Sequence, residues 1–450
     1  MSMKRLVVCM LVLCMSMLYC AAALGEEEIT IRYSYWGSSY ENDAMQKIAA
    51  SYEALHPNVH IECVYIPNAE YTTKMTAMIA SGDEPDISYL FANDFVNWAE
   101  QNKFVNLYEY LDKDDRYTRD SFTPNTFCEV REGEANAMIF CNELIQLYYN
   151  VDLFNEMSVA PLPASPEDAL TWDEFVKVLQ TLTVDINGNN ALSPDFDKDR
   201  IVTYGFDFSK SAINWAAMVY QNGGSILTED GSALNLGDEK ALDAIQKLSD
   251  LINVYHVTPD PLTSANANMS VTAALQSKQV AVVMDGSWSN LDLGSIDINY
   301  DVACLPNLGS DPCFEIATSV CGIFNTSKHP DVAWDFLMFM LNPSSAIDLY
   351  AKGLWMPIMK DWYTDEALCA QWASPETTSH TPGFVESAVK FPQYNSKLGP
   401  ETYIINWSKI DAVIESALDS VWLGNISAEE AIQEITKPVN SMVQGYIYIK

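Results

Sequence analysis

The segment Gln279-Val-Ala-Val-Val-Met-Asp-Gly-Ser-Trp288 decides the fold that this sequence predicts. Val280 to Met284 is an uninterrupted apolar run, which is typical of a short, fully buried strand. The run ends at Asp285-Gly286, so Ser287 and Trp288 follow just beyond the carboxyl end of the strand. In open α/β sheets, ligands bind in the crevice outside that end. The segment therefore predicts an α/β protein with a ligand site near Trp288, the alternative being that the indole only fills the core.

The first part of the chain alternates strand and helix signals. Apolar periodicity and stop signals predict, in order, a strand at 29–36, a helix at 44–55, a strand at 59–66, a helix at 72–81 and a strand at 85–91. This order predicts a parallel sheet covered by helices on both faces. Trp36 ends the first strand as Trp288 follows the later one, so two remote tryptophans take equivalent structural positions.

A chain of 450 residues is too long for one compact core, so we expect two lobes. The segment 137–150 is predicted to be a strand that crosses from one lobe to the other, and 316–324 a second crossing back. Hinge motion is expected at these crossings, near Asn142 and Ser319. We assign residues 26–141 and 319–362 to the first lobe, and 142–318 and 363–450 to the second lobe.

The composition limits the class of partner. The formal net charge is -36, while 48% of the residues are hydrophobic and 11% are aromatic, which is typical of a well-packed globular protein. So acidic a surface repels phosphate backbones, which argues against nucleic acid as a partner. It also disfavours adsorption to anionic lipid headgroups. A neutral or a cationic ligand is compatible with this charge.

The N-terminal segment 1–25 is typical of a secretory signal peptide. Lys4 and Arg5 precede an apolar stretch, and small residues at 23–25 mark a cleavage site. We therefore expect an exported protein, extracellular or associated with the cell surface. Two alternatives stay open: an uncleaved anchor helix, since the apolar stretch is nearly long enough to span a bilayer, and lipid attachment at Cys20.

Seven cysteines follow the signal segment, and their number and spacing indicate neither a zinc site nor a dense disulfide framework. We expect most of them to be buried free thiols that pack as small apolar residues. They are Cys63, Cys128, Cys141, Cys304, Cys313, Cys321 and Cys369.

One loop carries a candidate calcium site. Asp185, Asn187 and Asn189 place oxygen ligands at alternate positions around Gly188, as at the start of a calcium-binding loop. The glutamate usual at the twelfth position is replaced by Phe196. A plain Asn-Gly turn is the alternative interpretation. Apart from this possible Ca²⁺, we expect no required cofactor.

Motifs of catalysis are absent from the sequence. It contains no Gly-rich phosphate loop, no His-Glu-x-x-His pair and no Gly-x-Ser-x-Gly elbow. The five histidines are scattered without metal spacing. With 61 acidic residues, chance carboxylate pairs abound and do not indicate a glycosidase. We therefore predict a protein that is not an enzyme.

Several short motifs, in order and spacing, resemble the extracellular solute-binding proteins of bacterial ATP-binding cassette carbohydrate importers, the maltodextrin-binding type. The resemblance covers nearly the whole mature chain. Its markers are Trp36, Ser81-Gly-Asp-Glu-Pro-Asp-Ile87, Leu147-Tyr-Tyr-Asn-Val-Asp-Leu-Phe154, Thr171-Trp-Asp-Glu-Phe175, Asn222-Gly-Gly224, Asp285-Gly-Ser-Trp288 and Ala333-Trp-Asp-Phe-Leu337. Some relatives bind calcium near an Asp-x-Asn-Gly loop, which supports the candidate site at Asp185.

The resemblance implies a type II periplasmic-binding-protein fold, with two α/β lobes that each hold a mostly parallel sheet flanked by helices and that close on a sugar between them. It implies a monomer that delivers its ligand to the transmembrane subunits of an importer. The family's ligand positions correspond to Trp36, Trp288 and the region of Asn93 and Asp94. The full candidate set is Trp36, Ser38, Asn93, Asp94, Asn142, Asn214, Trp215, Asp285, Ser287, Trp288 and Trp355.

The residue types also suit a sugar on physical grounds. An apolar sugar face packs on an indole, while the rim of hydroxyls needs donors and acceptors such as Asp, Asn and Ser. A wrong epimer leaves buried polar groups unpaired, at a cost of roughly 1–3 kcal/mol each. We therefore predict capture of a carbohydrate, and an oligosaccharide is the favoured form. The alternatives are the same fold binding a polyamine or peptide, and a secreted glycoside-acting enzyme.

Overall fold

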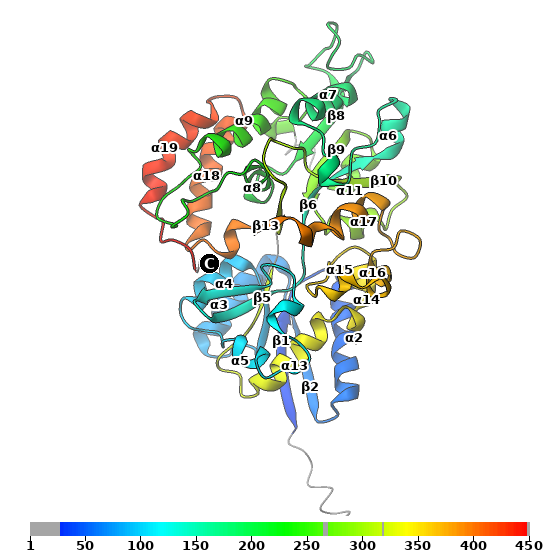
Figure 1. Ribbon diagram of the computed structural model, residues 1–450. Coiled ribbons are helices and arrows are strands. Elements are labelled where there is room, and N and C mark those ends of the chain that lie inside the picture. Colours follow the sequence, from blue (N-terminus) through cyan, green and yellow to red (C-terminus); the bar gives the residue numbers. More distant parts are fainter. Residues whose placement is uncertain (1–27, 264–268, 317–318, 448–450) are drawn as a thin grey trace, which may run out of the picture.

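The computed structural model describes residues 28–263, 269–316 and 319–447. Figure 1 shows two lobes stacked one above the other, with the first lobe built mainly from the N-terminal part of the chain. The signal peptide predicted at 1–25, with its three cysteines and the possible lipid site at Cys20, lies outside the described residues. Within the described part of the chain, no helix is both long and apolar enough to cross a bilayer.

The first lobe is built on a six-stranded sheet of mixed direction. Its order is β2 (Val59–Tyr65), β1 (Ile29–Tyr35), β3 (Ile87–Leu90), β12 (Val320–Ile323), β5 (Glu134–Ile139) and β4 (Phe127–Arg131). The three N-terminal strands are parallel, as predicted, whereas β12, β5 and β4 pair antiparallel. The expectation of a mostly parallel sheet is therefore wrong. The reason is that β12 starts at the lobe junction, where Val320 pairs with Leu90, and so runs against β3.

Helices cover this sheet on both sides, as the strand-helix alternation predicts (Figure 1). Met45, Ile48, Ala49 and Tyr52 form the buried stripe of the first helix at helical spacing. Ser38 starts that helix, because its side chain accepts the Glu41 N–H in a capping box. The helices of this lobe are α2 (Ser39–Leu55), α3 (Tyr71–Ser81), α4 (Ala92–Ala99), α5 (Tyr108–Leu111), α13 (Pro330–Leu341), α14 (Ile347–Ala351), α15 (Asp361–Thr364) and α16 (Glu366–Trp372).

The second lobe holds a five-stranded mixed sheet in the order β10 (Tyr300–Ala303), β6 (Ile145–Asn150), β9 (Val280–Gly286), β8 (Ile201–Phe208) and β7 (Val184–Asp185). Only β8 and β9 pair in parallel. Because β6 arrives from the first lobe, it begins at the junction, where Ile145 pairs with Gly286 at the carboxyl end of β9. This register places the segment after β9 at the junction between the lobes.

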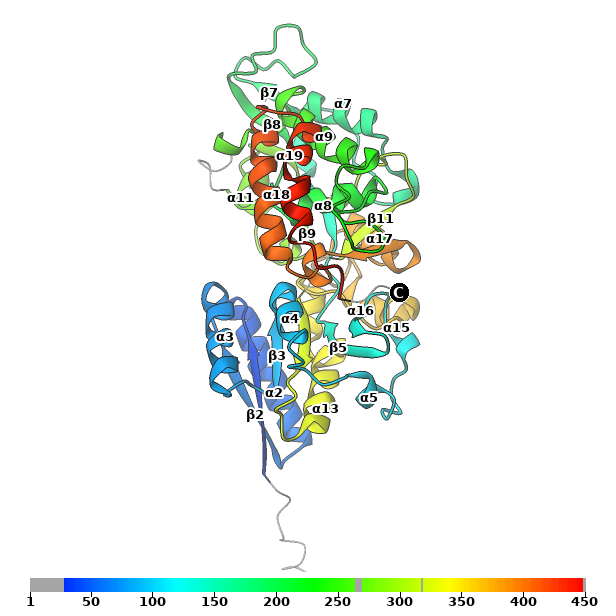
Figure 2. The same cartoon turned by 90° about the vertical axis from the view of Figure 1, so that its left-hand side faces the viewer.

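Two groups of helices flank the second sheet (Figures 1 and 2). A separate two-stranded sheet joins β11 (Cys313–Ile316) to β13 (Asn395–Leu398). One group of helices comprises α6 (Val151–Glu156), α7 (Trp172–Leu182), α8 (Ala212–Gln221), α9 (Glu239–Asn253), α18 (Trp407–Trp422) and α19 (Ala428–Asn440). The other comprises α11 (Val271–Gln276), α12 (Ser289–Leu293) and α17 (Pro382–Ala388).

The predicted crossing at 137–150 does pass between the lobes, but as two strands, β5 and β6, joined by residues 140–144. The second crossing runs beside it, since the Phe140 N–H donates to the Ser319 carbonyl at 3.0 Å. A third connection follows α16, which packs with α14 and α15, whereas α17 packs on β10. The lobe boundary expected between 362 and 363 therefore falls inside α15, because the chain re-enters the second lobe only after α16.

The cysteines that the structure describes carry no disulfide, which confirms the prediction of free thiols. Five are buried, and Cys63 and Cys369 are half-buried. Desolvation raises the pKa of the Cys128 thiol to about 12. Such thiols stay protonated at neutral pH and pack as small apolar groups.

Candidate ligand-binding site between the lobes

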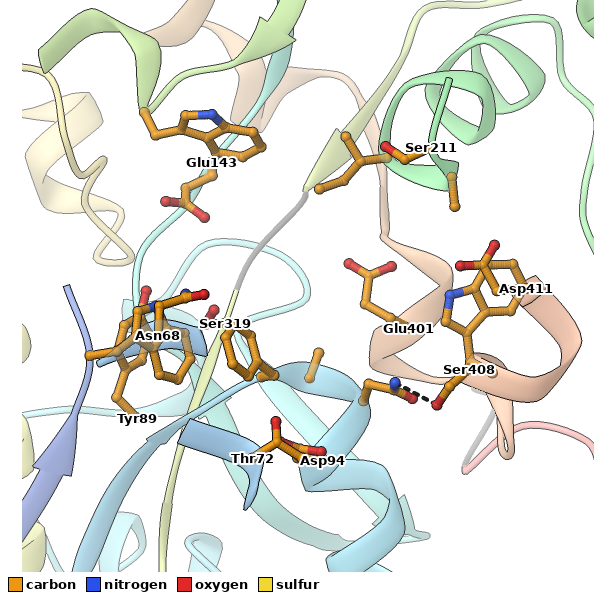
Figure 3. Close-up of a pocket in the computed structure, with 18 of the residues that line it drawn as sticks. Asn68, Thr72, Tyr89, Asp94, Glu143, Ser211, Ser319, Glu401, Ser408 and Asp411 are labelled. Carbon is orange, nitrogen blue, oxygen red and sulfur yellow. Dashed lines mark hydrogen bonds between the residues drawn. The ribbon is translucent and has the colours of Figure 1, made fainter. Parts of the chain in front are cut away.

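A cavity of about 890 Å³ lies between the two lobes. Its first-lobe wall is formed around the carboxyl ends of β1 and β3 and the start of α4. Its second-lobe wall is formed by Trp288, two residues after β9, by the start of α8, and by the segment from η6 (Pro400–Thr402) into α18. Figure 3 shows the side chains of both walls pointing into the shared space. The topology thus brings together strand ends far apart in sequence.

The first-lobe wall is an aromatic cluster around Trp36. The Trp36 ring stacks against Tyr89, with centroids 4.1 Å apart, and against Phe91, at 4.0 Å. The Tyr71 ring meets Trp36 edge-on at 4.7 Å. Trp36 lines the cavity with only 9% of its surface exposed, so its ring is held in one orientation. Such pairs add about 0.5–1.5 kcal/mol each beyond the area they bury. Together they form an aromatic platform in which Tyr89 and Phe91 cover the two faces of the Trp36 ring.

Polar side chains surround this platform. The Asp94 Oδ2 accepts a hydrogen bond from the Thr72 hydroxyl at 2.6 Å, and the Asp94 side chain is 9% exposed. Desolvation raises the pKa of Asp94 despite that bond. Asn93 donates through Nδ2 to the Ser408 Oγ of the second lobe at 2.6 Å, which is the dashed line in Figure 3. This bond ties α4 to α18 across one side of the cavity, where Figure 2 shows the two lobes facing each other.

Trp288 stands on the second-lobe wall, directly after β9, and is half-buried. Its ring lies against the backbone of Gly286, where an added Cβ would come within 2.2 Å of the indole. Glycine at 286 is therefore required for this ring position. Ser287 pairs with the crossing segment: its N–H donates to the Leu144 carbonyl at 2.9 Å, and its Oγ accepts the Leu144 N–H at 3.2 Å. The crossing strand thus fixes the loop that presents Trp288.

One face of α18 supplies residues that the sequence analysis missed. Trp407, Asp411 and Glu415 line the cavity and lie at i, i+4 and i+8, so they share one side of the helix. The signal was present in the sequence, because an aromatic residue and two acids recur at helical spacing beside an apolar stripe. That buried stripe consists of Ile410, Ile414, Leu418, Val421 and Trp422.

Apart from Tyr89, every ionisable side chain in the cavity wall is a carboxylic acid, and no Lys, Arg or His is among the lining residues in the described chain. The six carboxylates belong to Glu41, Asp94, Glu143, Glu401, Asp411 and Glu415. Figure 3 shows the carboxylates of Glu143 and Glu401 directed into the open space. The net charge of the sequence could not reveal that these six acids surround one cavity, since the sequence does not show which acids lie close together.

The ionisation of these acids is suppressed. Desolvation, and then repulsion from Glu41, raises the pKa of Glu143 to about 8. Desolvation raises the pKa of Glu401 to about 7. Desolvation, followed by repulsion from Glu415 and Glu401, raises the pKa of Asp411 to about 7. The wall therefore holds protonatable acids close to neutral pH because nothing positive from the protein stabilises their anions.

Of the eleven candidate residues, Trp36, Ser38, Asn93, Asp94 and Trp288 line the cavity, and the other six do not. The buried asparagines hold backbone instead of facing the cavity. Asn142 Nδ2 donates to the Pro357 carbonyl at 2.5 Å, and Asn214 Nδ2 donates to the Met284 carbonyl at 2.8 Å. Both residues are fully buried. Their expected place in the cleft wall is wrong, because the crossing and the end of β9 use their amides.

Trp215 and Trp355 are also interior residues. Trp215 is completely buried, with its ring 6.5 Å from that of Trp407, so it supports the wall from behind. Trp355 is 2% exposed and meets Phe140 edge-on at 4.5 Å. Asp285 and Ser287 likewise lie outside the cavity wall; Asp285 accepts from the Ser289 hydroxyl at 2.6 Å, and Ser287 holds Leu144. These residues have the same side-chain types as those that line the cavity, and only tertiary packing distinguishes the two sets.

In the loop of the candidate calcium site, the carboxylate of Asp185 accepts hydrogen bonds from the backbone. Asp185 Oδ1 accepts the N–H groups of Asn187 and Asn189 at 2.8 and 2.9 Å, and Oδ2 accepts that of Asp197 at 2.8 Å. Desolvation of Asp185 opposes ionisation, but these hydrogen bonds outweigh it and lower the pKa to about 2. The calcium site stays a prediction. Thermal melting with and without calcium tests it, because bound calcium would raise the melting temperature.

Residues 37–347 match the family model of the bacterial extracellular solute-binding proteins. That is more than half of the chain. The chain belongs to this family. A melibiose/raffinose/stachyose-binding protein from Bacillus subtilis is 24% identical over 354 residues, which cover 72% of this chain and 73% of the relative.

Solved structures share the fold. An ABC substrate-binding protein from Listeria monocytogenes in complex with cycloalternan superposes with a TM-score of 0.74 at 19% identity, over 92% of this chain and 99% of the other. A cyclic alpha-maltosyl-1,6-maltose binding protein from Arthrobacter globiformis gives 0.74 at 20% identity, over 93% and 100%. These likenesses confirm the predicted two-lobe α/β fold, with mixed sheets in place of mostly parallel ones.

Family membership settles the broad role of this solute-binding protein. Members are exported, non-catalytic receptors that bind a solute for an ATP-binding cassette transporter. The prediction that the chain is not an enzyme is confirmed by this membership, and the alternative of a secreted glycoside-acting enzyme is not retained.

Proposed function

We propose that this solute-binding protein captures an oligosaccharide in the cavity between its lobes and delivers it to the transmembrane subunits of an importer. The observation that carries the proposal is the placement of Trp36, Trp288 and Trp407 on the walls of one cavity of about 890 Å³. That volume lies in the range of sites that enclose small organic ligands. Relatives are named for binding melibiose, raffinose and stachyose, cycloalternan, and cyclic alpha-maltosyl-1,6-maltose, which supports a carbohydrate here.

The two walls supply what a sugar requires. The rings of Phe91 and Trp288 are available to cover the apolar C–H side of a pyranose ring, and Asn68, Thr72 and Ser211 add neutral hydrogen-bonding groups at the cavity wall. A ligand that touches both lobes stabilises the closed arrangement through its differential contacts with it. The crossings at 140–144 and 319 are the segments where such a hinge would move.

Isothermal titration of the mature protein against a panel of oligosaccharides tests the proposal. We expect saturable heat with at least one sugar, and a loss of that heat in Trp288→Ala. Heat with a cationic amine such as spermidine and none with any sugar would defeat it. A polyamine is the second candidate function, and the all-acidic wall of the cavity is the observation that favours it.

The proposal also covers the oligomeric state of the protein and the processing of its N-terminus. We propose a monomer at the cell exterior, either released after cleavage near residue 25 or anchored by a lipid at Cys20. Light scattering of the purified protein tests the monomer, because a dimer would double the mass. Mass spectrometry of the N-terminus made in its own cells distinguishes a free amino terminus from a lipidated cysteine.

A further inference from the structure

The charge of the cavity wall bears on which sugar fits it. Six carboxylates line the cavity, drawn from α2, α4, the first crossing, η6 and α18, and they surround it from both lobes. No basic side chain of the described wall offsets them. A neutral sugar forms hydrogen bonds with one or two carboxylates but brings no charge to balance the rest. An arrangement of six unopposed acids is unfavourable unless a bound cation or bound protons neutralise it.

Two of these acids have bonding capacity that the protein leaves unused. Asp94 is nine-tenths buried and lines the cavity, and its only hydrogen bond in the described chain joins Oδ2 to Thr72. Asp411 Oδ1 is buried and has no hydrogen-bond partner among the described residues. Buried polar atoms normally have partners. A ligand with N–H⁺ groups would satisfy these oxygens and supply charge-assisted bonds.

Aromatic rings stand beside the acids. Phe91, which stacks on one face of Trp36, lines the same space as Asp94, and Trp407 lies one turn before Asp411 on α18. An indole face attracts a cation as well as a sugar's C–H face. A linear polyamine would use the acids and the cation–π contacts, but it would leave the flat platform without a ring to stack on it.

We propose that the cavity selects a carbohydrate that carries protonated amino groups, an amino-sugar oligomer. The inference rests on the proposed carbohydrate function and adds the charge of the ligand to it. The aromatic rings bind the pyranose faces, and the carboxylates of both lobes pair with the ammonium groups. When the cationic ligand binds at neutral pH, carboxylic acids of the wall lose protons to the solvent, because the ammonium groups stabilise their anions.

The test compares sugars that differ only in charge. Glucosamine oligomers, their N-acetylated counterparts of equal length, maltodextrins and spermidine are titrated into the mature protein at low and at physiological ionic strength. We expect the free-amine oligomers to bind at least about tenfold more tightly than the acetylated ones, with an affinity that falls as salt rises. Titration in two buffers of different ionisation enthalpy measures protons, and we expect net release with the amine ligand only.

Matched variants locate the effect. Asp411→Asn removes one carboxyl group from the wall, and Glu434→Gln removes one from the exposed face of α19, so each variant loses one acid. We expect Asp411→Asn to weaken amine binding several-fold and to reduce proton release, whereas Glu434→Gln changes neither. Cooperative melting transitions of the ligand-free proteins would show that both variants fold.

The outcomes separate this inference from the function on which it rests. Tight binding of a neutral oligosaccharide, with weaker binding of its amine form and no proton release, overturns the inference and leaves the carbohydrate function standing. Binding of spermidine without any sugar overturns both. No binding of any sugar in the panel counts against the carbohydrate function and therefore against the amino-sugar ligand as well.

Discussion

The two walls of the cavity are built in opposite ways. In the first lobe, Trp36 is clamped among Tyr71, Tyr89 and Phe91 and is only 9% exposed, so the platform belongs to the core. In the second lobe, Trp288 is half-buried and lies on the backbone of Gly286. In the first wall, therefore, the same ring serves ligand binding and the stability of the core, so a substitution of Trp36 affects both. In the second wall, Trp288 can be replaced with little loss of stability.

The acidic side chains of the cavity are also divided between the two walls. Three of the six acids lie on the second lobe, in η6 and along one face of α18. Two of these, Glu401 and Asp411, have pKa values raised to about 7 by desolvation. The second lobe therefore adds a pH-sensitive surface to the apolar platform of the first. Substitutions on each wall test whether the two walls differ in this way.

The largest effect is expected from Trp36→Ala. Removing a tryptophan from a packed aromatic cluster lowers the free energy of unfolding by about 3–5 kcal/mol and weakens ligand binding at the same time. Chemical denaturation of the ligand-free protein measures the first quantity and titration calorimetry the second. Trp36→Phe is the control, since it keeps a stacked ring and should recover most of the stability. Full stability in Trp36→Ala would remove the distinction between the two walls.

Trp288→Ala should lower affinity without comparable loss of stability. We expect at least tenfold weaker binding, about 1.4 kcal/mol, because the variant loses the contact between the indole and the ligand. The melting temperature of the ligand-free protein should change little, because the ring is half-buried at the surface of the cavity. Intact affinity combined with a large fall in stability would assign Trp288 to the core.

A pH dependence is expected from the acidic wall. Folding raises the pKa of Glu143, Glu401 and Asp411 above their usual values, to about 8, 7 and 7, so the folded protein binds more protons than the unfolded chain. Their contribution to stability is present at acidic pH and is lost as pH rises from about 4 towards 8. Asp411→Asn should therefore raise the stability of the ligand-free protein near pH 8 by on the order of 1 kcal/mol, after allowance for solvent screening.

Melting curves of wild type and Asp411→Asn across this pH range measure that difference. The two proteins should approach the same stability at acidic pH, where the wild-type carboxyl is protonated. A gap that stays constant with pH would show that the substitution acts through packing and that Asp411 does not titrate in this range.

The smallest effect is expected at the hydrogen bond between the lobes. Asn93→Ala removes the donor to the Ser408 hydroxyl, and a bond of this kind contributes about 0.5–1.5 kcal/mol. Affinity should fall less than about tenfold, through a shift towards the open arrangement. Ser408→Ala should have the same effect, and the double variant should cost no more than either single one. Additive losses would mean that the two side chains act independently.

Several elements were predictable because their signals are local. The first helix followed from the stripe of Met45, Ile48, Ala49 and Tyr52. The carboxyl-end positions of Trp36 and Trp288 followed from strand length and the strand-helix order, and both residues line the cavity. The five candidates in the cavity wall stand next to a strand or helix terminus that the sequence marks.

Other residues could not be assigned from the sequence because their role depends on remote partners. Trp215 and Trp355 have the same chemistry as Trp36, and only burial against Trp407 and Phe140 distinguishes them. The direction of β12 was missed for the same reason, since pairing with β3 depends on where the chain returns from the other lobe. The acids of α18 recur at helical spacing, which the sequence shows. The acids of the opposite wall lie on separate elements, so no spacing in the sequence relates them.

The sequence by itself determined the two-lobe α/β class and the placement of two tryptophans beyond strand ends, because periodicity, caps and strand order are written within short stretches of chain. Only the tertiary structure decided which aromatic rings face the cavity and that six acids share it without a basic partner. The physical reason is that burial and electrostatic repulsion depend on distances between segments hundreds of residues apart, which no local pattern specifies.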